Sequence, residues 1–378
     1  MKIFYIANIR LPTEKAHGIQ IMKMCEAFSR AGIEVTLVVP RRLNPIKKSA
    51  FSYYHVSDLF RIQRLPVIDF IAIDWLLGPL AFWLEQFFFS VAARWFLRAV
   101  NVKEVIVYTR DLFLARVFSG SGKRVVLEAH EFPRHPRLYR KNWRGLDRII
   151  VLNKYLQDCF VREGVPREKI MIAADGVDLS QFSPRISMGK ARESLALPLD
   201  KKIVLYTGHL YGWKGARILA EAARELPKEF LTIFVGGTEK DVSRFRRAYS
   251  AIPNLLILGH QAYERIPIWL QAADILVLPN THDAAISTHY TSPLKLFEYM
   301  AAEKPIIASD LPSIREVVNN ENAVLVKSND SHLLAEAIKK LSVDKRLSLQ
   351  IATQAGLEVK KYSWEKRAKA IIAFINQS

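Results

Sequence analysis

Residues 274–310 constrain the fold of this chain more than any other stretch. They begin with a short apolar run, DILVLP, which predicts a buried parallel strand because strands covered on both faces are continuously apolar. A polar loop follows, and then Ser292 and Pro293, which are favoured at the N-cap and at the first position of a helix. We expect that helix to run through residues 294–303 and a second strand to occupy residues 305–309.

Such a unit places a helix N-terminus at the carboxyl end of a strand. Phosphates bind at this position in α/β sheets, because backbone N–H groups and the helix dipole both point there. We therefore expect Ser292, Pro293 and Leu294 to contact a phosphate, with Lys295 adding a mobile positive charge. Glu298, one turn further on, is placed to reach the ribose of a nucleotide. An ordinary amphipathic helix with a surface glutamate explains the same pattern.

This stretch resembles the donor site of the family 4 retaining glycosyltransferases, which have the GT-B fold. Members typically carry a Glu-x7-Glu motif here, and its second Glu binds the ribose hydroxyls. Glu298 matches that second position, whereas Tyr290 occupies the first, so the sequence departs from the full motif. The resemblance implies an α/β protein whose two Rossmann-like domains face a cleft.

A second motif lies in KKIVLYTGHLYGWKG, residues 201–215, which predicts a strand, a glycine-containing loop and a helix from about Gly215. This arrangement favours phosphate binding, although a lone lysine is more often a solvated side chain. The resembling family has Gly-Arg or Gly-His and then Lys-Gly at this place, and the basic pair contacts the donor diphosphate. The matching residues are Gly208, His209 and Lys214.

The beginning of the chain predicts a βαβ unit. A strand at residues 2–8 is followed by a loop that ends in Gly18, then by an amphipathic helix and by a strand at residues 34–40. In the resembling family the first loop contributes to the donor phosphate and acceptor site. Gly18 would allow the backbone to approach a ligand closely there.

Two later strands, at residues 104–110 and 124–133, end at Arg110 and His130. Both ends belong on the ligand side of a parallel sheet, so we expect the two side chains to lie close together. His130 stands where the resembling family has an active-site histidine that contacts the sugar. A histidine whose hydrogen bonds are satisfied within a loop is the alternative.

The length of 378 residues indicates two domains of ordinary size. We place the first at residues 1–190 and the second, which binds the nucleotide sugar, at residues 191–360. As in other GT-B proteins, a helix at residues 361–378 would cross back to the first domain. Two cysteines, Cys25 and Cys159, predict a reducing compartment without a disulfide framework.

The formal net charge of +18 requires an explanation, and residues 1–185 contribute +12 of it. A basic surface can meet anionic lipid, nucleic acid or an acidic substrate, or it can simply be solvated. The sequence contains no nucleic-acid-binding module, which argues against nucleic acid as a partner.

The most apolar region is residues 66–100, but it predicts no membrane span. Asp74 and Glu85 enclose only ten residues, whereas a span needs about 20. We expect either a buried helix pair or a segment partly in a membrane interface, which favours aromatic side chains. For most of the aromatics we expect core packing; they are Trp75, Trp83, Phe87, Phe88, Trp95 and Phe96.

Together these features predict a glycosyltransferase of the hexosyltransferase type, which moves a sugar from a nucleotide sugar to a glycan or lipid-linked acceptor with retention. The catalytic candidates are His130, Lys214 and Glu298. No Asp-x-Asp occurs, so we expect neither a metal nor another cofactor. The alternatives are a sugar-nucleotide 2-epimerase on the same fold, and a non-catalytic nucleotide-binding protein, which the missing glutamate at Tyr290 would suit.

The charge and the aromatic stretch also lead to a hypothesis about location. We expect a cytoplasmic enzyme that is peripheral on the inner face of the plasma membrane and acts in cell envelope polysaccharide synthesis. The competing interpretation buries the aromatic stretch and assigns the basic charge to a soluble acceptor.

Overall fold

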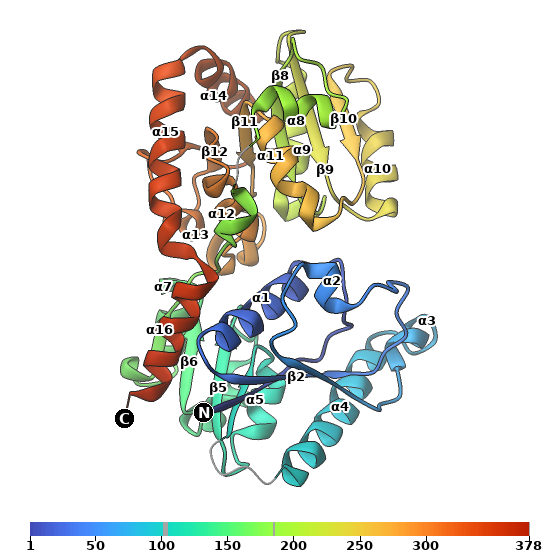
Figure 1. The fold of residues 1–378 in the computed structure, drawn as a ribbon, viewed down its shortest axis with the longest axis vertical. Helices are drawn as coiled ribbons and strands as arrows, with labels where there is room; N and C mark the ends of the chain where they lie inside the picture. Colours follow the sequence, from blue (N-terminus) through green and yellow to red (C-terminus); the bar gives the residue numbers. More distant parts are fainter. Residues whose placement is uncertain (101–104, 184–185, 378) are drawn as a thin grey trace. The chain divides into compact units, whose positions relative to one another are not determined.

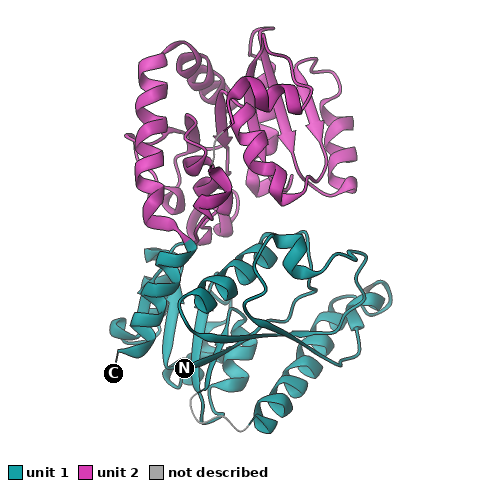
Figure 2. Ribbon diagram, viewed as in Figure 1, with its two compact units in different colours: residues 1–174, 364–378 teal, residues 175–363 magenta. Residues whose placement is uncertain are grey.

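The chain forms two α/β units in a computed structural model that describes residues 1–100, 105–183 and 186–377 (Figures 1 and 2). Unit 1 comprises Met1–Ala174 together with Trp364–Ser378, and unit 2 comprises Asp175–Ser363. The first unit thus ends at Ala174, whereas the sequence analysis placed the boundary between the domains near residue 190. The last helix belongs to unit 1.

Unit 1 is built on one parallel sheet with the strand order β3-β2-β1-β4-β5-β6-β7. The predicted βαβ unit is present, since β1 pairs with β2 in parallel and helix α1 connects them. Strand β3 was not predicted, because its sequence RIQRL is mostly polar and its side chains are largely exposed at the sheet edge. The strands are β1 (Lys2–Ile6), β2 (Glu34–Pro40), β3 (Arg61–Leu65), β4 (Val105–Thr109), β5 (Arg124–Ala129), β6 (Arg148–Val151) and β7 (Ile170–Ile172).

The helices of unit 1 cover this sheet, and α16 packs against α1. The apolar region folds as a 3-10 turn, Phe70–Ile73, followed by α3 and by the long helix α4. The helices are α1 (Ala16–Arg30), α2 (Ala50–Tyr54), α3 (Asp74–Leu77), α4 (Pro79–Ala99), α5 (Leu112–Phe118), α6 (Arg140–Arg144), α7 (Lys154–Arg162) and α16 (Trp364–Asn376).

The prediction that most aromatic side chains of this region lie in the core is wrong. Five of the six are exposed, and Trp75 and Trp95 expose 80% and 68% of their surface. The reason is that other residues fill the inner face of α4, Glu85, Gln86 and Phe89 among them, which leaves these aromatic side chains outside. Among the described residues, no helix is both long and apolar enough to cross a bilayer.

Unit 2 has a second parallel sheet, with the strand order β10-β9-β8-β11-β12-β13. The chain leaves the central pair β8 and β11 in opposite directions, which is the arrangement that opens a ligand site at the carboxyl ends of the strands. The strands are β8 (Lys202–Thr207), β9 (Phe230–Val235), β10 (Leu255–Leu258), β11 (Ile275–Leu278), β12 (Ile306–Ser309) and β13 (Val324–Val326).

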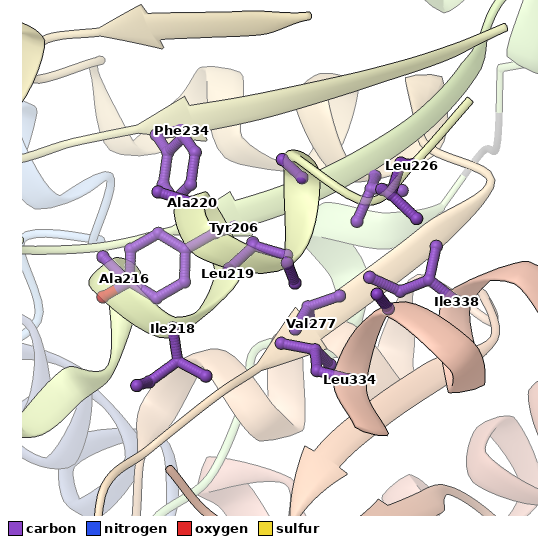
Figure 3. Packing of buried hydrophobic residues seen from close by; sticks show 14 of the residues in the cluster. Tyr206, Ala216, Ile218, Leu219, Ala220, Leu226, Phe234, Val277, Leu334 and Ile338 are labelled. Atoms are coloured by element: carbon purple, nitrogen blue, oxygen red, sulfur yellow. The ribbon is translucent and has the colours of Figure 1, made fainter. Parts of the chain in front are cut away.

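Small residues on α9 let this helix approach the sheet of unit 2. Ala216 and Ala220 lie against Tyr206 and Phe234 of the strands, and Leu334 of α14 joins the same cluster (Figure 3). The helices are α8 (Met188–Ser194), α9 (Ala216–Ala223), α10 (Glu239–Tyr249), α11 (Ile266–Ala272), α12 (Leu294–Ala301), α13 (Pro312–Arg315), α14 (Ser331–Val343) and α15 (Lys345–Glu358). This close packing holds β8 and β11 in place.

Candidate functional site

Glycines bring two loops together at the β8–β11 switch point of unit 2. Gly215 has a φ of 72°, and a Cβ atom there would lie 1.6 Å from the carbonyl oxygen of Pro279, at the end of β11. Gly208 follows β8 with a φ of 119°, and Gly236 packs against its backbone. Only glycine permits both the positive φ and these approaches. The loop after β8 is therefore pressed against the loop after β11.

Hydrogen bonds fix the turn that carries Lys214. The carbonyl oxygen of Trp213 accepts from the backbone N–H of Thr281 at 2.9 Å and from Oγ of Ser287 at 3.3 Å. The Tyr206 hydroxyl donates to the carbonyl oxygen of His209 at 2.6 Å. The predicted phosphate loop is thus held by strand β8 on one side and by the loop after β11 on the other.

Helix α12 begins at Leu294, but its N-cap lies one residue later than predicted. Its N-cap is Pro293, which has no side-chain hydrogen bond to offer, and Leu294 is its first residue. The prediction of Ser292 as the cap is wrong, because Oγ of Ser292 instead accepts the backbone N–H of Asp175 at 3.0 Å. As a result no side chain caps the N-terminus of α12, and its first N–H groups suit an anionic ligand.

Lys295 is buried at this place without a hydrogen-bond partner for its Nζ atom. That atom lies 3.9 Å from the ring centroid of Tyr206 and next to Gly208. Burial, and then the neighbouring charge of Lys214, hold the pKa of Lys295 well below its usual value. Burial likewise lowers the pKa of Lys214 to about 8. Burial thus disfavours the charged form of both lysines, and an anion bound here would offset that cost.

Glu298 lies one turn beyond Lys295 and is only 8% exposed, so it is not a surface glutamate. Burial raises its pKa to about 7, while a hydrogen bond from Tyr263 and the charge of Lys295 act in the opposite direction. Tyr263 comes from the 3-10 turn Tyr263–Arg265. Two lysines and one carboxylate are thus gathered at the carboxyl edge of the sheet in unit 2.

Unit 1 has its own polar cluster, centred on Glu128 of β5. This carboxylate is fully buried and accepts hydrogen bonds from Nε2 of Gln20 at 2.6 Å and from Arg367 of α16 at 2.9 Å. Tyr108 of β4 is a further partner. Burial alone would raise the pKa of Glu128, but the charge of Arg367 and the hydrogen bonds hold it well below its usual range. Glu128 is therefore an ionised carboxylate.

The predicted neighbours Arg110 and His130 are linked through this cluster. Arg110 donates to Oε1 of Gln20 at 2.8 Å, and Nε2 of His130 lies 2.8 Å from Oε1 of Glu128. Because an ionised carboxylate only accepts, Nε2 of His130 must carry the hydrogen. Burial, followed by the charge of Arg110, lowers the pKa of His17 to about 3, so His17 is neutral here.

Gly18 does not lie in the loop where the sequence prediction had it. Helix α1 already begins at Ala16, so Gly18 is in its first turn. A Cβ atom on Gly18 would meet the Tyr54 hydroxyl at 2.1 Å, and that hydroxyl is bonded to the backbone of Thr13. The glycine makes room for α2, a helix that the sequence did not reveal.

Sequence reasoning missed Glu128, Arg367 and Tyr263. Glu128 left a signal, because it is a charged residue inside the otherwise apolar stretch VVLEA, whereas Arg367 stands among other charged residues in WEKRAKA and left none. A charged residue at a buried position needs a partner, so Glu128 implied a buried basic residue without showing which one. Tyr263 left no signal, since it stands in a polar loop.

Comparisons with known proteins agree with this geometry. Residues 187–358 match the family "Glycosyl transferases group 1". The D-inositol 3-phosphate glycosyltransferase of Xylanimonas cellulosilytica is 26% identical over 55% of this chain and 51% of its own length. The amylovoran biosynthesis glycosyltransferase AmsK of Erwinia amylovora is 26% identical over 60% of this chain and 54% of its own. The chain thus spans about half the length of these curated relatives.

The fold as a whole is that of a solved structure. The crystal structure of Anabaena HepE in complex with UDP-glucose has a TM-score of 0.74 and covers 99% of this chain and 98% of its own, at 17% identity. Two parallel Rossmann-like sheets and this likeness confirm the predicted GT-B fold.

Proposed function

We propose that this chain, whose residues 187–358 match the family "Glycosyl transferases group 1", moves a sugar from a nucleotide sugar to a hydroxyl of a glycan or lipid-linked acceptor. One observation carries the proposal. Nζ of Lys295 is buried without a hydrogen-bond partner, at the uncapped end of α12. This site suits the diphosphate of a nucleotide-sugar donor. Glu298, one turn further along α12, would then bind the ribose hydroxyls of the same donor.

The chemistry follows from the charges. As the sugar leaves, negative charge grows on the departing diphosphate. Lys214, Lys295 and the N–H groups of α12 would stabilise it, and fixed charges in a water-poor site are effective in this role. We propose that they do so without a metal ion and that the reaction retains the anomeric configuration. In unit 1, His130 would contact the sugar, with Glu128 as the positioning residue that fixes its tautomer.

The comparisons support a choice of substrates. The complex of HepE with UDP-glucose makes UDP-glucose the first donor to test. The relative that is named for amylovoran biosynthesis supports a cell envelope polysaccharide as the class of acceptor. We further propose that the protein works at the inner face of the plasma membrane, because unit 1 holds 31 Lys/Arg against 16 Asp/Glu, a formal +15.

The test is a transfer assay with a panel of nucleotide sugars and acceptors. We expect release of the nucleotide diphosphate that depends on the acceptor, a product with the donor's anomeric configuration, and activity that persists in EDTA. Loss of activity in EDTA that a divalent cation restores would refute metal independence. A changed sugar without acceptor would point to an epimerase. Binding of the nucleotide without any turnover would point to the non-catalytic alternative.

A further inference from the structure

Helix α4 buries Phe89, Ala93 and Leu97, yet it also exposes a second apolar side to water. Its inward face carries Glu85 and Gln86, which are 0% and 1% exposed. Its outward face is almost entirely apolar. Helices of water-soluble domains bury the apolar stripe and expose a polar one, so this second, exposed apolar side needs a cause.

Hydrogen bonds hold α4 in this orientation. Glu85 accepts from Nε of Arg42 at 2.9 Å and from the backbone N–H of Phe70 at 3.1 Å. Gln86 donates to Oδ2 of Asp111 at 2.7 Å and also bonds Asn8. Rotating the helix to bury its apolar side would leave these polar groups unpaired, at about 1–3 kcal/mol each.

Helices α3 and α4 run along the outside of unit 1 (Figure 1), and we call the apolar side chains that they expose the α3–α4 face. Its residues recur at helical spacing and expose between 39% and 80% of their surface; they are Trp75, Leu76, Leu80, Trp83, Phe87, Phe88, Val91 and Trp95. Apolar surface on this scale marks a site of interaction.

The residue types and the charges identify the partner. Among the described residues, the exposed tryptophans Trp75, Trp83 and Trp95 all lie on this face, and tryptophan favours the membrane interface. Exposed Arg94 and Arg98 flank it on α4. Unit 1 has a formal charge of +15, whereas unit 2, with 24 basic and 21 acidic residues, has only +3. An anionic bilayer surface satisfies both the aromatic and the basic groups.

We propose that the α3–α4 face inserts into the headgroup boundary of an anionic bilayer. This inference rests on the proposed function at a membrane and names the surface that would serve it. The inner side of α4 bonds Asn8, Arg42 and Asp111, which follow β1, β2 and β4 at the carboxyl edge of the unit 1 sheet. One helix therefore contacts lipid on one side and the edge that carries Arg110 on the other. This would hold that edge at the depth of a lipid-linked acceptor.

The test compares two triple variants of the full chain. The first is Trp83→Ser, Phe87→Ser and Trp95→Ser on the α3–α4 face. The matched control is Val343→Ser, Leu349→Ser and Leu357→Ser, which changes three exposed apolar residues of unit 2. All six side chains are exposed, so both variants should keep the wild-type thermal transition. The wild type and the control should sediment with phosphatidylglycerol vesicles, and the first variant should bind about tenfold or more weakly.

Brominated phosphatidylglycerol adds a readout specific to this face. It should quench the tryptophan emission of the wild type, because the exposed tryptophans are the ones that would enter the lipid. Wild-type affinity in the first variant, or no vesicle binding by the wild type, would overturn the proposal. A wild-type dimer that the first variant converts to a monomer, again without vesicle binding, would assign the face to self-association.

Failure of this inference is distinguishable from failure of the proposed function. The first variant should still transfer sugar to a water-soluble acceptor, since its three changes lie outside the sites of both units. Transfer without vesicle binding by the wild type would refute the α3–α4 face and keep the glycosyltransferase. Vesicle binding that depends on the face, with no transfer from any donor, would refute the glycosyltransferase and keep the face.

Discussion

Each of the two units has its own parallel sheet with a switch point, but the buried charges beside the two sheets are compensated differently. In unit 1, Glu128 is buried with Arg367 as a close partner. In unit 2, Lys295 is buried with a second lysine nearby and no hydrogen-bond partner for its Nζ atom. The first cluster is neutralised internally and suits an uncharged group such as a sugar. The second has unbalanced positive charge and suits an anion such as a diphosphate.

The largest effect should come from breaking the internal compensation in unit 1. Arg367→Met leaves Glu128 buried without its cation, which should destabilise unit 1 by about 3–5 kcal/mol. Amide hydrogen exchange of the unit 1 strands in urea measures this. The matched control is Arg140→Met, which breaks the partly exposed pair of Arg140 with Glu163 and should cost under about 1 kcal/mol. Equal losses in the two variants would contradict the compensation.

The next largest effect concerns turnover in unit 2. Lys214→Ala should lower kcat by about a hundredfold to a thousandfold and affect donor binding less, because the charge on the leaving group grows in the transition state. Steady-state kinetics with a saturating acceptor separate the two effects. Lys228→Ala, an exposed lysine of the same unit, is the control. A wild-type kcat in Lys214→Ala would remove this lysine from the mechanism.

Glu298→Ala should weaken donor binding by about ten- to a hundredfold, since a charged hydrogen bond is worth about 1.5–3 kcal/mol. Isothermal titration with the donor measures it, and Glu336→Ala, at an exposed glutamate of α14, is the control. Unchanged affinity in a folded Glu298→Ala protein would show that this carboxylate does not hold the ribose.

Lys295→Met should separate stability from binding. It removes a buried ammonium whose Nζ atom has no hydrogen-bond partner, so it should stabilise ligand-free unit 2 by about 1–3 kcal/mol, while donor binding is lost. The same kind of substitution at Arg367 should destabilise unit 1, and this contrast of sign is the sharpest check on the comparison. Destabilisation in both variants would mean that Lys295 is compensated within the ligand-free protein.

The pH profile should show the smallest effect. Glu298, with a pKa of about 7, is protonated below that pH and then loses acceptor capacity for the ribose. Lys214, with a pKa of about 8, loses its charge above that pH. Accordingly kcat/KM should be highest between these values and fall by about tenfold per pH unit beyond them. Glu298→Gln should abolish the acid limb; an acid limb that persists would have to come from another group.

Lys214, Lys295 and Glu298 could be predicted as site residues because each is placed by a loop and a helix that lie next to it in the sequence. A strand, a loop with glycine and a helix are encoded in consecutive residues, so β8 to α9 and β11 to α12 were both predicted, with boundaries wrong by one or two residues. What the loops bind remains a proposal. Strand β3 and helix α2 were missed because each is only five residues long, and neither has a periodic apolar pattern to identify it.

The sequence by itself determined most of the order of strands and helices, the two switch-point loops and their basic residues, because apolar periodicity and glycine-containing turns are encoded in a few consecutive residues. Only the tertiary structure decided which partners the buried polar groups have. Arg367 reaches Glu128 across 239 residues, and Ser292 bonds Asp175 in place of capping α12. It also decided that α4 turns its aromatic side outward, because Glu85 and Gln86 find their hydrogen bonds inside unit 1. Such partners are set by distances through space, which spacing along a chain does not encode.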